Sequence, residues 1–120
     1  MHQHPVPIFL RILLFIAVLT GGIAAVAAND KPLDGKVLYR TNCKVCHDKG
    51  SPNKQYTPMT FTQDQWRKFY SAKLIPAHKT AVEPKSGRKL MELLNPDQIK
   101  AIQRFCIDHA ADSEQPATCG

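Results

Sequence analysis

The chain has 120 residues, of which 43% are hydrophobic and 22% charged, and its formal net charge is +6. This composition excludes intrinsic disorder and collagen-like repeats, and no internal repeat suggests a solenoid. The length allows one domain, and four cysteines are too few for a scaffold held together mainly by disulfides.

The N-terminal segment has the pattern of a secretory signal peptide. Arg11 precedes Ile12 to Ala28, an uncharged run of 17 residues that ends in small side chains. We expect residues 1–28 to be the signal, cleaved after Ala27 or Ala28. The alternative is an uncleaved membrane anchor, since the run has the minimum length of a spanning helix. Export predicts a periplasmic protein, or one anchored to the inner membrane if the segment is retained.

The exported domain, residues 29–120, is small. Without Arg11, 15 basic residues face 10 acidic ones, which leaves a net charge of +5. A domain of this size buries only about two-thirds of its unfolded surface, so its stability is marginal. We therefore expect a cofactor, a metal or a disulfide to stabilise it.

The first helix of this domain is predicted from Gly35 to about Cys46, with Asp34 as its N-cap. Its inner face should carry Val37, Leu38 and Tyr39. Glycine is a poor helix former, so Gly35 indicates close packing against another element.

The remaining elements are also helical in pattern. A short helix is predicted from Asp64 to about Ala72, with loops over 48–62 and 74–87 and a short turn over 90–94. Asn95 begins the last helix as N-cap, with Pro96 at N1 and Gln98 completing a capping box. This helix should end near 109–111, before a polar tail. Its predicted inner stripe is Ile99, Ile102, Phe105 and Cys106. No segment alternates as a strand does, which predicts an all-α fold.

Cys43-Lys44-Val45-Cys46-His47 forms a C-x-x-C-H motif, the attachment motif of haem c. Two thiols three residues apart on a helical turn reach the two vinyl groups on one edge of a haem and form thioethers. His47 follows directly and is the expected proximal iron ligand. The motif therefore predicts one covalently bound haem c.

Other roles of this cysteine pair fit less well. A thioredoxin-like redox pair requires a βαβ pattern, which is absent. A structural zinc site requires about two more ligands at finger spacing. An ordinary short disulfide between Cys43 and Cys46 is a further alternative, but the exported location, the helical setting and the adjacent His47 favour haem.

The segment from Leu33 to Asp108 resembles the class I c-type cytochromes. The match rests on Gly35 and Tyr39 before the haem motif and on Phe105 in the last helix. The resemblance implies a small helical domain around one haem, in which the N- and C-terminal helices pack together. It also implies single-electron transfer in an exported compartment. Because no acid–base pair or activated nucleophile is evident in the sequence, we do not expect an enzyme.

The sixth iron ligand is not fixed by the sequence. The resembled family takes a methionine from the loop before the last helix, but this chain has no Met-Pro there. His78, in a proline-flanked loop, is the first candidate, Met91 the second and Met59 the third. Met91 could instead be core filler among leucines. A methionine would raise the reduction potential, and a second histidine should lower it.

Further side chains suggest secondary features. Cys106 and Cys119 are expected to form a disulfide in an oxidising compartment, with two unpaired thiols as the alternative. His109 is expected to favour the C-terminal end of the last helix as a cation. The aromatic residues of the second helix should divide between haem contacts and core; they are Trp66, Phe69 and Tyr70.

The charges around the motif predict the kind of partner. A basic rim would steer a redox partner with an acidic docking surface; it comprises Lys36, Arg40, Lys44, Lys49 and Lys54. Nucleic-acid binding is not expected. Two other functions stay open: a haem-based ligand sensor or peroxidase-like enzyme with an open sixth site, and a membrane-anchored electron-transfer subunit of a larger complex.

Overall fold

The computed structural model describes residues 31–117. The predicted signal segment and Cys119 therefore lie outside the described residues.

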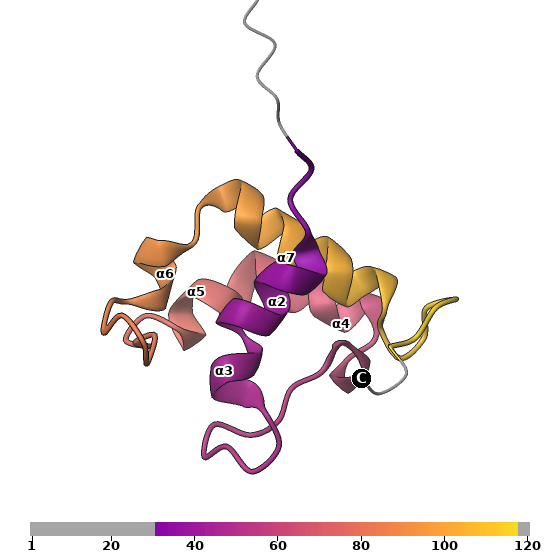
Figure 1. Ribbon diagram of the computed structural model, residues 1–120. Coiled ribbons are helices and arrows are strands. Elements are labelled where there is room, and N and C mark those ends of the chain that lie inside the picture. The colour runs from indigo at the N-terminus through magenta and orange to yellow at the C-terminus, as the bar shows by residue number, and fades with distance from the viewer. Residues whose placement is uncertain (1–30, 118–120) are drawn as a thin grey trace, which may run out of the picture. The chain divides into compact units, whose positions relative to one another are not determined.

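The described part of the chain is helical (Figure 1). Residues 31–117 contain no β-strand, and an isolated bridge joins Val82 and Lys89. The prediction of an all-α fold is confirmed for these residues. The elements in order are α2 (Gly35–Asn42), α3 (Lys44–His47), the 3-10 turn η1 (Pro58–Thr60), α4 (Gln63–Lys68), the π-helical segment η2 (Phe69–Lys73), α5 (Leu74–Ala77), α6 (Leu90–Leu93) and α7 (Pro96–Asp108).

Helix α2 begins as predicted but ends earlier. The Asp34 carboxylate accepts hydrogen bonds from the Lys36 and Val37 amides, at 2.9 and 3.1 Å. At the other end, the Asn42 side chain donates to the Leu38 carbonyl at 2.8 Å. Such side-chain bonds compete with the backbone ladder and favour a helix end. The predicted helix of residues 35–46 is therefore divided into α2 and α3.

Helix α2 packs against α7 through Gly35 and Tyr39. A Cβ on Gly35 would collide with the Ala101 carbonyl oxygen and lie 3.0 Å from the Phe105 Cβ. Tyr39 is buried, and its ring centroid lies 5.5 Å from that of Phe105. The predicted close packing at Gly35 is confirmed. The placement of Val37 on the inner face was wrong: it is 52% exposed, because α7 contacts the opposite side of this short helix.

The second helix is longer than the sequence predicts. Helices α4 and α5 and the π-helical η2 form one run from Gln63 to Ala77, so the expected loop from residue 74 begins later. Pro76 suggested a break, because proline lacks an amide hydrogen and its ring clashes in a regular helix. The wider turn of η2 precedes it, and the Leu74 amide bonds to the Phe69 carbonyl there. We attribute the tolerance of Pro76 to that wider turn.

Helix α7 starts with the predicted capping box. The Asn95 side chain accepts a hydrogen bond from the Gln98 amide at 2.9 Å, and the Gln98 side chain accepts one from the Asn95 amide at 3.0 Å. Pro96 occupies the first helical position. Ile102 and Cys106 on the predicted inner stripe are buried, so this assignment is confirmed.

Asn95→Ala is expected to lower the free energy of unfolding by about 1 kcal/mol, since the Gln98 amide loses its acceptor. Urea unfolding followed by far-ultraviolet circular dichroism measures this change. Lys100→Ala, on the exposed face of α7, should stay within about 0.5 kcal/mol of the wild type. Equal stability of the Asn95→Ala variant and the wild type would contradict a role for the cap.

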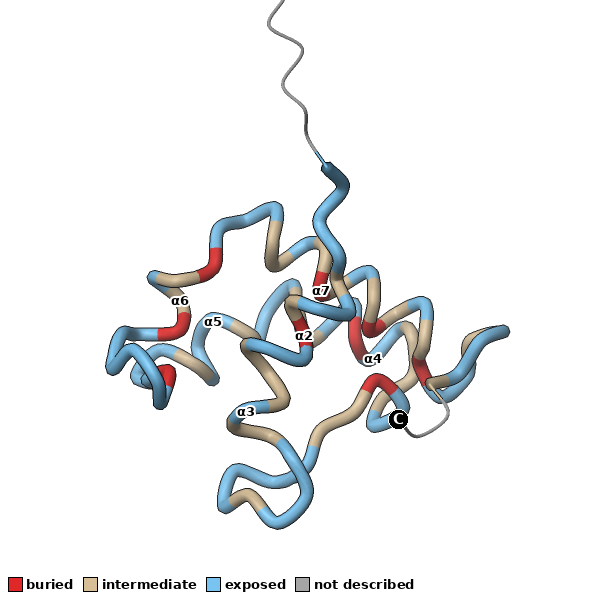
Figure 2. Tube along the Cα trace, in the orientation of Figure 1, coloured by how far each residue is buried: buried red, intermediate tan, exposed pale blue. Residues whose placement is uncertain are grey.

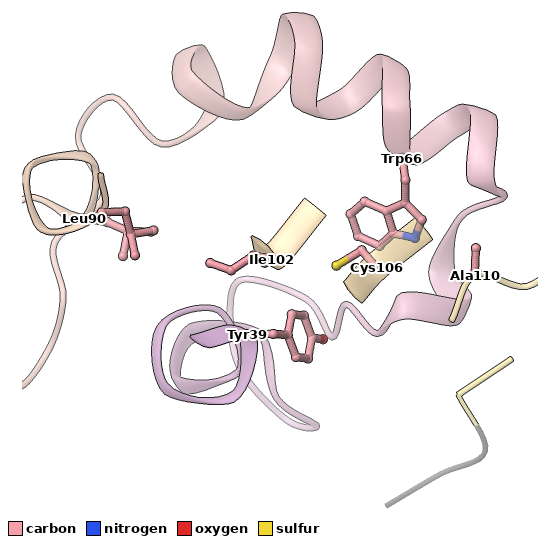
Figure 3. Packing of buried hydrophobic residues seen from close by; sticks show 7 residues of the cluster. Tyr39, Trp66, Leu90, Ile102, Cys106 and Ala110 are labelled. Carbon is pink, nitrogen blue, oxygen red and sulfur yellow. The ribbon is translucent and has the colours of Figure 1, made fainter. Parts of the chain in front are cut away.

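The core lies between α2, α4, α6 and α7, which carry buried positions on their inner sides (Figure 2). Figure 3 shows side chains of this cluster, with Leu90 set apart from the other labelled residues. The seven buried hydrophobic residues are Tyr39, Trp66, Leu90, Leu94, Ile102, Cys106 and Ala110. Helix α3, which carries the motif residues after Cys43, has no buried residue.

Candidate functional site

A single turn of backbone holds the C-x-x-C-H motif. The Cys43 amide bonds to the Tyr39 carbonyl at the end of α2, at 2.9 Å. The Cys43 carbonyl then accepts from the amides of Cys46 and His47, at 3.2 and 3.1 Å. These bonds hold the two thiol-bearing residues and His47 on one turn, as the sequence predicts.

The loop after the motif fixes the His47 ring. Its Nδ1 lies 3.0 Å from the Asn53 carbonyl oxygen and 3.1 Å from that of Lys54. Because a carbonyl only accepts, Nδ1 must carry the hydrogen, and Nε2 keeps the lone pair that binds a metal. Lys54 has a φ of 62°, in the left-handed region that is uncommon for residues other than glycine. This turn thus places two carbonyls against one imidazole.

His78 is held in the same way. It follows α5 as its C-cap, and its Nδ1 lies 2.8 Å from the Leu74 carbonyl oxygen. Its Nε2 is therefore also the metal-binding nitrogen. The Phe69 ring meets the His78 ring edge to face, with centroids 6.4 Å apart. Such partners orient a ligating histidine and fix its tautomer.

The two imidazoles lie close together although 30 residues separate them in the sequence. Their ring centroids are 6.0 Å apart, and the ring planes make an angle of 85°. Two imidazoles that bind one metal ion from opposite sides have centroids roughly 6 Å apart, because each metal–nitrogen bond is about 2 Å long and each nitrogen lies about 1 Å from its ring centroid. The spacing is the one expected of two imidazoles that share a metal ion, and it is also that of two rings packed edge to face.

Both histidines and both motif cysteines line one cavity of about 380 Å³. This volume is in the range of small-molecule and cofactor sites. The rest of the wall is mainly apolar and comes from every helix around the core; it includes Tyr39, Phe61, Trp66, Leu90, Leu94 and Ile102. The cavity thus combines an apolar wall with two thiols and two imidazoles.

Burial, with a smaller contribution from Cys46, raises the pKa of the Cys43 thiol to about 12. The thiol therefore stays protonated at neutral pH.

The methionine candidates lie in different places. Met91, on α6, is half-buried and lines the cavity. Met59, on η1, is 42% exposed and is not among the residues that line it. Of the three candidates for a second axial ligand, His78 and Met91 are thus brought to the cavity.

The other predicted residues have mixed positions. Trp66 is buried, and its Nε1 donates to the Pro58 carbonyl at 2.7 Å. Phe69 and Tyr70 are half-buried, and all three aromatics line the cavity, with Trp66 also in the core. Their division between haem contacts and core stays a prediction.

The C-terminal residues pack against the body of the domain. Cys106 is fully buried, and its sulfur lies 3.6 Å from the Tyr70 hydroxyl. Its disulfide with Cys119 stays a prediction, since Cys119 lies outside the described residues. His109 caps α7 and contacts the Gln115 carbonyl through Nδ1 at 2.8 Å, so it also holds the tail.

Glu83 is a buried acidic residue of the cavity wall that was not among the predicted site residues. Its carboxylate accepts hydrogen bonds from the amides of Lys85 and Ser86, at 2.9 and 2.7 Å. These bonds, first that from Lys85, hold the pKa of the Glu83 carboxyl below its usual range. The Glu-Pro-Lys-Ser-Gly sequence at residues 83–87, typical of a turn, was the available signal.

Glu83→Gln is expected to reduce stability at neutral pH, because the amide replaces a charged acceptor. Since folding lowers this pKa, the Glu83 carboxylate stabilises the fold above its unfolded pKa of about 4.3, and its contribution is lost as the pH falls through the folded value. The stability difference between wild type and Glu83→Gln should therefore be largest near neutral pH and shrink below about pH 4. Urea titrations of both proteins measure it, and a difference independent of pH would contradict this role.

The basic residues near the motif are mainly on the surface. Lys36, Arg40, Lys49 and Lys54 are exposed, and Lys44 is half-exposed. Within residues 31–117 the ion pair present joins Arg67 and Asp64, at 2.9 Å. The cations around the motif are therefore available to a partner.

Comparisons of the chain with protein-family models, with curated proteins and with solved structures find no match. In the part of the chain that the structure describes, no helix has the length and hydropathy needed to cross a bilayer. No three His, Cys, Asp or Glu side chains of these residues are grouped so as to hold a metal ion by themselves.

Proposed function

We propose that the chain is a small exported c-type cytochrome, similar to class I, that carries one electron between redox partners. Cys43 and Cys46 attach one haem c covalently, and His47 binds its iron. The observation that carries the proposal is the pair of imidazoles at 6.0 Å, facing one cavity with the two motif cysteines. The motif alone does not indicate a second iron ligand, and the cavity alone does not indicate a covalently bound haem.

We assign His78 as the sixth ligand. Its imidazole has the spacing from His47 that a shared metal ion needs, and its Nδ1 is already bonded to a carbonyl. Met91 lies in the same cavity and is the alternative ligand. The exposed position of Met59 gives it the least support.

The residues around the site favour electron transfer over ligand chemistry. When bound, haem c supplies an iron centre that accepts and releases one electron. His47 and His78 would both bind the iron, which disfavours binding of a gas or a peroxide. The apolar wall limits access of water. Two imidazoles should give a lower reduction potential than a histidine with a methionine.

The surroundings of the site suggest its partners. The exposed cations near the motif would speed association with an acidic redox protein, and this effect would weaken with salt. A periplasmic location follows from the signal-like segment, and retention of that segment would give the membrane-anchored alternative. We propose no nucleic-acid partner.

The experiment is expression of the full chain with a cytochrome c maturation system, alongside a Cys43→Ser/Cys46→Ser variant. The wild type should keep its haem through denaturation and extraction with acidic acetone, because thioether bonds survive both treatments. The variant should lose all haem under the same treatment. Complete extraction of haem from the wild type would contradict the proposal.

A further inference from the structure

The rings of His47 and His78 are almost perpendicular, at 85°. If both rings contact one iron along a shared axis, this angle is the angle between the two axial ligand planes. Free imidazoles would rotate about their bonds to iron, so a defined angle requires that the protein hold each ring. In the structure, the His47 ring and the His78 ring are each held by their own set of contacts.

The His47 plane is set by the loop after the motif. Two consecutive carbonyls, of Asn53 and Lys54, both lie within 3.1 Å of Nδ1. The Tyr56 ring meets the His47 ring edge to face, with centroids 5.0 Å apart and an angle of 87°. Rotation of the imidazole would break these hydrogen bonds and move the ring against Tyr56.

The His78 plane is set by the helical run before it. The Leu74 carbonyl holds Nδ1 at 2.8 Å, and the Phe69 ring lies at 88° to the imidazole. The π-helical turn of η2 brings Phe69 and Leu74 together, since the Leu74 amide bonds to the Phe69 carbonyl. Such π turns occur often at functional sites. Phe69 and Leu74 are thus in place to fix one ring orientation.

We infer that Phe69 is a positioning residue that, with the Leu74 carbonyl, holds the His78 plane perpendicular to that of His47 at the haem iron. This inference rests on the proposed function. Perpendicular imidazole planes leave two of the iron d orbitals nearly equal in energy, whereas parallel planes separate them. The ligand angle is therefore visible in the electron paramagnetic resonance spectrum of the ferric protein, independently of electron-transfer activity.

The first test uses the matured full chain, oxidised and frozen. We expect a low-spin signal with one large g value, the other two being too broad to resolve. A rhombic low-spin signal with three resolved g values would show nearly parallel planes and overturn the inference.

The second test compares three variants. Phe69→Leu should convert part or all of the signal to the rhombic type, since His78 gains freedom to rotate. Phe69→Tyr keeps the ring and should keep the wild-type signal. Tyr70→Leu removes a ring from the same cavity wall that packs against Phe69 and makes no ring contact with either histidine among the described residues, and it should also keep the signal. Equal effects of Tyr70→Leu and Phe69→Leu, or no effect of Phe69→Leu, would overturn the role of Phe69.

These outcomes separate the two proposals. Loss of haem on extraction contradicts the proposed function itself. Covalent low-spin haem that depends on His78 but gives a rhombic signal leaves the proposed function in place and contradicts only the perpendicular arrangement.

Discussion

His78→Ala is expected to convert the ferric protein from low spin to high spin, with the haem still covalently attached. Cys43, Cys46 and His47 remain, so attachment and the proximal bond are kept. The missing imidazole leaves the sixth position to water or to an added ligand. The reduced variant should bind carbon monoxide without denaturant, whereas the reduced wild type should bind little or none. Visible absorption spectra measure both changes.

Two substitutions serve as controls for this result. His78→Met offers a thioether from the same position and, where it reaches the iron, should give a low-spin protein with a higher potential. Met91→Leu keeps the volume of the side chain and should leave the spectrum unchanged. If Met91→Leu becomes high spin while His78→Ala stays low spin, Met91 is the ligand and our assignment of His78 is wrong.

Gly35→Ala is expected to destabilise the fold by at least about 2 kcal/mol. In most helices this substitution is favourable by up to about 1 kcal/mol, because alanine is the better helix former. Here the new methyl group would meet the Ala101 carbonyl oxygen, and backbone on two packed helices cannot easily move aside. The melting temperature should fall by roughly 10 °C, a large effect for a domain of this size.

Thermal unfolding of the haem-loaded protein measures this loss. The control is Lys36→Ala, at the next position of α2, whose side chain is exposed and should change stability by no more than about 0.5 kcal/mol. A Gly35→Ala variant as stable as the wild type would mean that α2 and α7 are not packed as closely as the structure has them.

Local signals in the sequence were sufficient for the starts of α2 and α7. The caps at Asp34 and Asn95 depend on side chains within three residues, so their chemistry can be read directly. The close packing at Gly35 could also be predicted, because glycine is a poor helix former and its presence in a helix indicates close contact with another element. The helical run through Pro76 was missed because a π-helical turn has no sequence pattern as clear as a cap.

Some residues of the site could likewise be predicted from local sequence, whereas others depend on the tertiary fold. Cys43, Cys46 and His47 are contiguous, and their spacing alone predicts the chemistry. The pairing of His47 with His78 depends on how α4, η2 and α5 cross the domain, which no local pattern gives. His78 was therefore a ranked candidate beside Met91 and Met59, and the structure supplies the 6.0 Å spacing that favours it. Glu83 was missed because its burial depends on the tertiary fold.

The central claim is a covalent haem with His47 and His78 as its axial ligands. The most direct test is the visible and near-infrared absorption spectrum of the matured full chain, oxidised and reduced. We predict a low-spin haem c in both states, without the charge-transfer band that a methionine–iron bond gives. A methionine band or a high-spin ferric spectrum would contradict the assignment of His78, and the absence of covalent haem would contradict the whole account.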